Sequence, residues 1–218
     1  MEKTSLQLKD FDDFVNACKH FGIEINNNQL GLFKKHYEIL IEWNKKINLI
    51  SRKEENILEK HFLDSILFLS EINGLCRGAI NRAPTILDIG SGGGFPGIPL
   101  AIMLPEWKFV LCESTGKKAN FLNFLVKELG LKNVEIINAR VETLHATSLP
   151  TKYDFVTARA VAKLDELIKY AKPLLKDRGC LLAYKGPNID EEIANVKMQM
   201  QIFSKNLNEA KRNLIVIS

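Results

Sequence analysis

The residues that could carry chemistry begin at positions 86–101, ILDIGSGGGFPGIPLA. An apolar run typical of a strand ends near Asp88, and Gly90 and the glycine triplet at 92–94 then lead into a helix-like stretch. Glycines leave no side chains in such a turn, so backbone amides can approach a ligand closely. Asp88 could hold the turn amides, cap the loop or face an amino group of the ligand. The pattern predicts a ligand site at the first strand–helix turn.

The spacing of the glycines limits which ligand this is. No Gly-Lys-Ser/Thr follows the loop, which excludes a P-loop for nucleoside triphosphates. Gly92, Gly94 and Gly97 formally match the GxGxxG of dinucleotide sites, so an NAD-dependent oxidoreductase stays open. Pro96 counts against that ligand, because it removes one N–H from the place where a pyrophosphate would bind.

A carboxylate downstream favours a ligand that contains adenosine. Glu113 ends the next β-rich run, KFVLCE, and a carboxylate there can accept hydrogen bonds from both hydroxyls of a ribose. NAD and S-adenosylmethionine both carry such a ribose. Glu113 therefore indicates an adenosine nucleotide or nucleoside without choosing between the two.

The elements that must position these residues alternate between strand and helix from residue 85 onward. We predict strands at 85–89, 108–113, 134–138, 153–158 and 180–185, and helices at 97–104, 115–129, 163–176 and 189–197. This alternation predicts an α/β fold with a doubly wound, mostly parallel sheet, whose ligands bind at the carboxyl ends of the strands. The tail, residues 199–207 and 212–218, predicts an antiparallel C-terminal hairpin.

The first third of the chain is expected to be helical. Apolar residues recur at helical spacing over 11–21, after the cap signals at 26–28, and over 54–72. We therefore divide the chain into an N-terminal helical region at 1–73, a connector at 74–84 that is rich in glycine and arginine, and a ligand-binding domain at 85–218.

Bulk composition excludes several classes of protein. The chain has 218 residues, 46% hydrophobic and 26% charged, with a formal net charge of +4. No apolar run is long enough to span a membrane, and the start lacks the apolar core of a secretory signal. The four cysteines are scattered without a CxxC pair, which favours reduced thiols, no metal site and a cytoplasmic location.

Several stretches together resemble a known family. LDIGSGGGFPGIPLA is similar to the first motif of class I methyltransferases, in the form found in the RsmG (GidB) family. WNKKINLIS, HFLDSI, ESTGKKANFL, ARVETL, ARAVAKL and AYKG extend the resemblance over about residues 30–186. Members of that family are bacterial enzymes that methylate N7 of a guanosine in small-subunit ribosomal RNA. The resemblance implies S-adenosylmethionine as the cofactor.

The resemblance also implies roles for individual residues. The methionine and adenosine moieties would contact the loop, Glu113 the ribose, Val141 and Glu142 the adenine, and Arg159 would lie at the methionine end as the catalytic residue. The full set of expected cofactor contacts is Asp88, Gly90, Gly92, Phe95, Glu113, Val141, Glu142 and Arg159. Guanine N7 carries a free lone pair in the neutral base, so its methylation needs positioning rather than a general base.

Further residues are candidates for contact with RNA or between domains. The cations expected to bind RNA phosphates are Lys45, Lys46, Arg52, Lys117, Lys118, Arg140 and Lys185. Trp43 and Asn44 could stack on RNA, although Trp43 is better explained as core between a helix and the sheet. His61 and Asp64 lie three residues apart on a predicted helix. They would either contact the site or join the helical region to the main domain.

The sequence therefore favours an S-adenosylmethionine-dependent methyltransferase that acts on 16S ribosomal RNA or the small ribosomal subunit, as a monomer. Two alternatives remain open at this point. One is an NAD-dependent oxidoreductase, which would bind NADH and not adenosylmethionine. The other is a non-catalytic RNA-binding ribosome-assembly factor that keeps the cofactor fold and transfers no methyl group.

Overall fold

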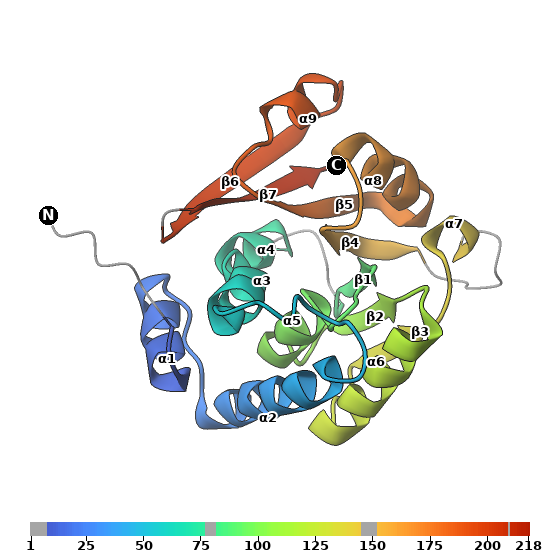
Figure 1. The fold of residues 1–218 in the computed structure, drawn as a ribbon. Helices are drawn as coiled ribbons and strands as arrows, with labels where there is room; N and C mark the ends of the chain where they lie inside the picture. The colour runs from blue at the N-terminus through green and yellow to red at the C-terminus, as the bar shows by residue number, and fades with distance from the viewer. Residues whose placement is uncertain (1–7, 77–81, 145–151, 209) are drawn as a thin grey trace, which may run out of the picture.

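A seven-stranded sheet of order β3-β2-β1-β4-β5-β7-β6 forms the centre of the protein (Figure 1). The computed structural model describes residues 8–76, 82–144, 152–208 and 210–218. The strands are β1 (Thr85–Ile89), β2 (Lys108–Cys112), β3 (Val134–Ile137), β4 (Tyr153–Arg159), β5 (Leu175–Lys185), β6 (Met200–Leu207) and β7 (Ala210–Ile217). The five strands from β3 to β5 pair in parallel, whereas β7 pairs antiparallel with both β5 and β6.

This sheet confirms the predicted α/β class and the C-terminal hairpin. Strand β4 is buried almost throughout, as expected where helices cover both faces of a parallel sheet. One predicted strand start is wrong, because β5 begins at Leu175 rather than at residue 180. The register between β4 and β5 shifts between Tyr153 and Phe155, and Gly179 packs closely against the Tyr153 carbonyl. The shift in register lies opposite the first residues of β5, which the residue pattern did not predict as strand.

Helices cover the two faces of the sheet with separate cores. The elements after β1 are α5 (Gly97–Met103), α6 (Gly116–Leu129), α7 (Val141–Leu144), α8 (Leu164–Ala171), the 3-10 turn η2 (Lys172–Leu174) and α9 (Asp190–Ala194). Buried residues of α5 and α6 belong to one cluster, and those of α8 belong to the other. The helix predicted over 163–176 is shorter than expected, because the chain tightens into η2 at Pro173, which has no N–H to donate.

The N-terminal elements are helical, as predicted. They are α1 (Phe11–His20), α2 (Asn27–Asn44), the π-helix η1 (Leu58–Leu63), α3 (Asp64–Ile66) and α4 (Leu69–Cys76). Asn26 and Gln29 form a reciprocal capping box at the start of α2. The helix predicted over 54–72 is wrong in detail, since it starts later, opens with π-type turns and is interrupted before α4.

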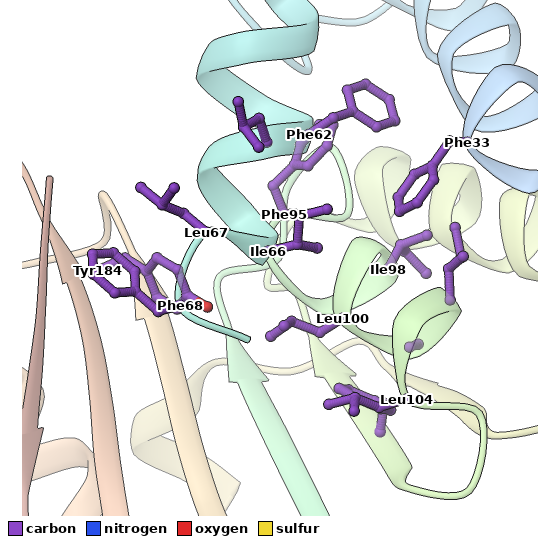
Figure 2. Close-up of a cluster of buried hydrophobic side chains, with 14 of the residues drawn as sticks. Phe33, Phe62, Ile66, Leu67, Phe68, Phe95, Ile98, Leu100, Leu104 and Tyr184 are labelled. Atoms are coloured by element: carbon purple, nitrogen blue, oxygen red, sulfur yellow. The ribbon is translucent and has the colours of Figure 1, made fainter. Parts of the chain in front are cut away.

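The N-terminal helices and one face of the sheet share a single hydrophobic cluster. Phe33 of α2 and Phe62 of η1 pack with Phe95 and Leu100, which lie in and after the glycine loop (Figure 2). The two predicted regions, 1–73 and 85–218, therefore share one hydrophobic core. Of the predicted connector, residues 74–76 complete α4, and residues 77–81 lie outside the described residues. In the described ranges, no helix has both the length and the apolarity required to cross a membrane.

Candidate active site

The glycine loop is fixed to the end of the neighbouring strand. The amides of Gly90 and Ser91 donate to the carbonyl of Cys112, at 2.8 and 3.2 Å. Gly90 and Gly92 have φ of 68° and 54°, a left-handed conformation that side chains disfavour. The carboxyl ends of β1 and β2 therefore meet at this loop, as the strand pattern predicted.

Glu113 connects the loop to the second predicted motif. Its Oε2 accepts a hydrogen bond of 3.0 Å from the amide of Gly92, and its Oε1 accepts one of 2.8 Å from the amide of Thr115. The side chain of Asn138, after β3, donates to the Glu113 carbonyl at 2.7 Å. Each carboxylate oxygen keeps a second lone pair that a ribose hydroxyl can use. The structure thus brings together the loop and the carboxylate that were predicted separately.

Asp88 lies beneath the loop. It is fully buried, and its Oδ2 accepts a hydrogen bond of 3.2 Å from the amide of Gly97, the first residue of α5. Its Oδ1 has no hydrogen-bond partner among the described residues. Burial raises the pKa of Asp88 to about 7. The capping role is therefore present, and a ligand contact by Asp88 stays a prediction.

A cavity of about 220 Å³ lies beside the loop. Val141 and Glu142, the two residues expected at the adenine, both line it, as does Gly90. Glu166 and Tyr170 of α8 form another part of the lining, and the Tyr170 hydroxyl donates to the Glu166 carboxylate. A larger hollow of about 1150 Å³ lies among the amino ends of the strands, next to Thr85, Lys108 and Val134. That position is far from the predicted motifs, so the smaller cavity is the candidate cofactor site.

The segment after β4 closes over the loop. Ala160 has φ of 56°, an uncommon conformation for a residue other than glycine and one that is concentrated at functional sites. A Cβ atom on Gly90 would lie 2.8 Å from Cγ2 of Val161, so only glycine allows this approach. Lys185 fixes the segment from the other side, donating to the Ala162 carbonyl and to Glu192.

Arg159, the last residue of β4, is held by the π-helix η1 and by α3. Its Nη1 donates to the carbonyl of Lys60 at 3.0 Å and to Oδ2 of Asp64 at 2.9 Å. Its Nη2 lies 3.2 Å from Nδ1 of His61, and the guanidinium lies over the Phe95 ring, 5.2 Å from the centroid. This pair, His61 and Asp64, therefore joins the helical region to the sheet, the second of the two roles considered for it.

His61 is a neutral acceptor in this arrangement. Burial and the charge of Arg159 lower the pKa of His61 to about 4. A guanidinium can only donate, so Nδ1 accepts and the neutral ring carries its proton on Nε2. The imidazole thus orients Arg159 without adding a charge.

His36 supports the glycine loop and was not identified from the sequence. Its Nε2 lies 3.2 Å from the carbonyl of Gly93, to which it donates, and its ring stacks on Phe95 at 5.0 Å between centroids. Burial lowers the pKa of His36 to about 3. A single histidine on the apolar face of α2 gives no local signal of a contact made 57 residues away.

Two predicted site residues have side-chain partners elsewhere in the protein. The side chain of Phe95 is buried against His36 and Phe62, and Figure 2 shows it beside Phe62. A contact between Phe95 and the cofactor stays a prediction. Lys185 is largely buried in its ion pair with Glu192, at 2.6 Å, and its contact with an RNA phosphate stays a prediction. In both cases another side chain of the protein contacts a residue that was expected to face a ligand.

The other predicted RNA contacts lie at the surface. Exposed side chains are Lys45, Lys46, Arg52, Lys117 and Arg140, and Lys118 is half-buried. The side chain of Asn44 is hydrogen-bonded within the protein, because its Oδ1 accepts from the amides of Leu49 and Ile50. Trp43 packs on Phe121 of α6, as its core interpretation predicted. Across the described ranges, no group of three His, Cys, Asp or Glu side chains could hold a metal ion.

Solved structures similar to this chain share its fold. A structure of a mutant of the protein MtNAS in complex with S-adenosylmethionine has a TM-score of 0.57 and 14% identity, with coverage of 97% of this chain and 80% of that one. An S-adenosylmethionine-dependent methyltransferase from Aquifex aeolicus has a TM-score of 0.52 and 16% identity, with coverage of 71% and 91%. At such identities the comparison concerns the fold, which is that of class I methyltransferases.

Sequence relatives are much more similar. "Ribosomal RNA small subunit methyltransferase G" of Lactococcus lactis subsp. lactis is 40% identical over 189 residues, which are 85% of this chain and 77% of that protein. The protein of the same name from Chlorobaculum tepidum is 41% identical over 185 residues, 84% of this chain and 81% of its own. A profile of the GidB family, described as rRNA small subunit methyltransferase G, matches residues 29–214. The chain therefore belongs to the GidB family and is an rRNA methyltransferase of that family.

Proposed function

We propose that this protein transfers a methyl group from S-adenosylmethionine to N7 of a guanosine in 16S ribosomal RNA. The observation that carries the proposal is the convergence of three motifs at one edge of the sheet. Gly92 in the first loop contacts Glu113 after β2, and Gly90 contacts the segment that follows Arg159. Family membership agrees with this arrangement of the site.

The residues of the site suit a cationic cofactor. The lining of the cavity includes the carboxylates of Glu142 and Glu166, and the buried Asp88 lies below the loop. Carboxylates attract the sulfonium and ammonium groups of adenosylmethionine and repel the pyrophosphate of NAD. The Oδ1 of Asp88, without a hydrogen-bond partner among the described residues, could accept from an ammonium group. This electrostatic fit disfavours the oxidoreductase alternative.

The chemistry requires positioning more than proton transfer. S-adenosylmethionine would supply an electrophilic methyl group, which the lone pair of N7 attacks as the methyl–sulfur bond breaks and S-adenosylhomocysteine leaves, without a general base. Gly90, Gly92 and Glu113 would hold the adenosine, with Val141 and Glu142 beside the adenine. Arg159 would act as the catalytic residue by donating to O6 of the guanine, which aligns N7. His61 and Asp64 orient that guanidinium.

The substrate and setting follow from the same proposal. The exposed cations Lys46, Lys117 and Arg140 would neutralise phosphates of an RNA whose target base is unstacked. We expect the protein to act as a monomer in the cytoplasm, on 16S rRNA or the small ribosomal subunit.

Transfer of a labelled methyl group to small ribosomal subunits that lack the modification tests the proposal. The product is mapped by chain cleavage at 7-methylguanine. Label at a single guanine is expected. If adenosylmethionine binds tightly but no label is transferred to any rRNA, the catalytic proposal fails and the assembly-factor alternative gains support. If NADH binds and adenosylmethionine does not, the cofactor assignment also fails.

A further inference from the structure

An exposed aromatic side chain lies next to a cluster of lysines outside the cofactor cavity. Phe124 of α6 is 41% exposed, which is unusual for a large apolar side chain. Trp43, near the end of α2, lies behind it with 5.4 Å between ring centroids and an angle of 40°. Trp43 also packs on Phe121, which is fully buried. The pair therefore presents one face of Phe124 to solvent on a rigid support.

The contacts between α2 and α6 show which cations surround this pair. Lys35, in the middle of α2, pairs with Glu128 near the end of α6, at 3.1 Å. Trp43, near the end of α2, contacts the middle of α6. The two helices therefore run in opposite senses, and the end of α2 approaches the first half of α6. This brings two basic segments that are distant in sequence to one surface.

The cations that these two segments carry are Lys45, Lys46, Arg52, Lys117 and Lys118. Lys45 pairs with Glu42 at 2.8 Å, and Arg52 contacts the Lys45 carbonyl at 3.5 Å. Neither Lys117 nor Lys46 forms an ion pair with a described residue within 4.0 Å. Lys117 precedes Phe124 by seven residues, two helical turns, and so lies on the same face of α6. No acidic side chain occupies the first turn of α6.

We propose that Phe124, supported by Trp43, stacks on an unpaired base of the RNA substrate while Lys46 and Lys117 bind the adjacent phosphates. Aromatic side chains between lysines are the arrangement that holds single-stranded nucleic acid, because every base has a face that stacks. The first turn of α6 follows Glu113 closely, so the surface adjoins the cofactor site. The inference rests on the proposed RNA substrate, and it adds a base-stacking surface away from the reacting nucleotide.

The fluorescence of Trp43, which lies against Phe124, can report this contact. The chain has two tryptophans, and Trp107 is buried and stacked on Phe155. In a Trp107→Phe background, Trp43 is the sole fluorophore. We expect a single-stranded oligoadenylate of roughly ten nucleotides, a length in the range of single-strand binding sites, to quench it. The midpoint of quenching should move to higher oligonucleotide concentration as salt is added, because phosphate contacts release counterions.

Variants in this background separate stacking from general binding. Phe124→Ala should weaken oligonucleotide affinity about 5- to 150-fold, the range for loss of one base–aromatic stack. Phe124→Tyr should restore it. Ile202→Ala removes another exposed apolar side chain, on β6, and should leave oligonucleotide affinity unchanged.

Lys117→Ala tests the phosphate contacts. It should lower the slope of log affinity against log salt concentration by about 0.7, the value for one phosphate on a single strand. Adenosylmethionine affinity should be the same in all four variants.

Three outcomes would overturn the inference. The first is no quenching at any salt concentration. The second is a Phe124→Ala variant with unchanged oligonucleotide affinity. The third is a Phe124→Ala variant that binds naked RNA normally but binds assembled subunits poorly, because the surface would then contact a ribosomal protein. Methyl transfer is measured separately. A protein that binds the oligonucleotide and transfers no methyl group contradicts the proposed function and leaves this surface in place.

Discussion

The carboxylate of Asp64 accepts a hydrogen bond of 2.9 Å from Nη1 of Arg159. Its other oxygen lies 3.0 Å from Nε of Arg212, so one largely buried carboxylate bridges β4 and β7. Methyl transfer to N7 moves positive charge from the cofactor into the guanine ring. An unpaired guanidinium beside that ring would oppose the transfer, so pairing with Asp64 allows Arg159 to donate a hydrogen bond at a lower electrostatic cost.

Replacing Asp64 by asparagine should therefore affect both stability and turnover. In Asp64→Asn, the amide NH₂ would face one of the two guanidinium groups, and both of these groups can only donate hydrogen bonds. No negative charge would then balance the two arginines. We expect the free energy of unfolding to fall by about 3–5 kcal/mol, as when one partner of a buried pair is removed. The kcat for methyl transfer should fall more than the KM for adenosylmethionine changes.

Asp154 offers a matched control for that variant. It is similarly buried and paired, with Arg82 at 2.6 Å and Lys176 at 3.1 Å, but it lies at the amino end of the sheet. Asp154→Asn should lower the unfolding free energy and leave kcat unchanged. Equal losses of kcat in the two variants would mean that Asp64 acts through stability alone. Chemical denaturation and steady-state kinetics at the same temperature distinguish these outcomes.

Removing Arg159 itself should slow methyl transfer strongly while the fold is kept. In Arg159→Ala, Asp64 retains Arg212 as a partner, so no buried charge is left alone. We expect kcat/KM to fall by about 100- to 1000-fold, the cost of losing one preorganised donor. Arg178→Ala, at an exposed position of β5, is the control and should keep full activity. Unchanged turnover in Arg159→Ala would remove its catalytic assignment.

The parts of the site that the sequence predicted are those that follow strand ends. The glycine loop and Glu113 each come directly after a buried strand, and the carboxyl ends of parallel strands meet at one edge. Their contact, between the Gly92 amide and the Glu113 carboxylate, follows from local pattern combined with fold class. The antiparallel hairpin was predicted because the tail is too short for another crossover helix.

The parts that were missed depend on contacts between distant segments. Nothing near His36 in sequence indicates that it reaches the Gly93 carbonyl. Phe95 follows the glycine loop, where a ligand was predicted, and its ring packs against the N-terminal helices. Lys185 ends β5 at the same edge of the sheet as the glycine loop, and it forms an ion pair with Glu192 of α9. Each of these contacts depends on how the chain packs, and residue type alone does not indicate it.

A pair of glycines can separate backbone strain from ligand binding. Gly90 and Gly22 have nearly the same φ, 68° and 72°, but a Cβ atom on Gly22 would meet nothing within 4 Å. Both Gly90→Ala and Gly22→Ala should lose roughly 1 kcal/mol of stability or slightly more, because alanine disfavours positive φ. Only Gly90→Ala should also lose adenosylmethionine affinity, since its methyl group collides with Val161. Calorimetric titration of both variants checks this, and equal affinities would contradict it.

His36 should make the protein sensitive to acid. Burial lowers its pKa to about 3, whereas an unfolded chain binds the proton near pH 6.5. Between these values the unfolded state holds one more proton, so stability falls as pH decreases, by up to about 1.4 kcal/mol per pH unit. His36→Gln keeps a donor for the Gly93 carbonyl. It should lower the slope of unfolding free energy against pH by the contribution of one proton. Chemical denaturation of both proteins at several values between about pH 4 and pH 6 measures this slope, and an unchanged slope in His36→Gln would contradict the prediction.

Asp88 should produce the opposite dependence. Its pKa is raised by burial to about 7 in the folded protein, against 3.8 ordinarily. Between about pH 4 and pH 7 the folded state holds the extra proton, so this residue lowers stability as pH increases. Asp88→Asn, measured without cofactor, should make the rise of stability with pH steeper by about 1.4 kcal/mol per pH unit in that window.

A comparison with Asp154 shows whether that change is specific to Asp88. Desolvation raises the pKa of Asp154, but hydrogen bonds from Arg82 and Thr85 outweigh it and hold the value at about 2. Asp154→Asn should therefore alter the pH dependence of stability only below about pH 4. Denaturation curves at pH 4.5, 5.5 and 6.5, roughly spanning the window, separate the two. If Asp88→Asn leaves the slope as it is in the unmodified protein, Asp88 is ionised when folded, and a bound cation or water must then satisfy its Oδ1.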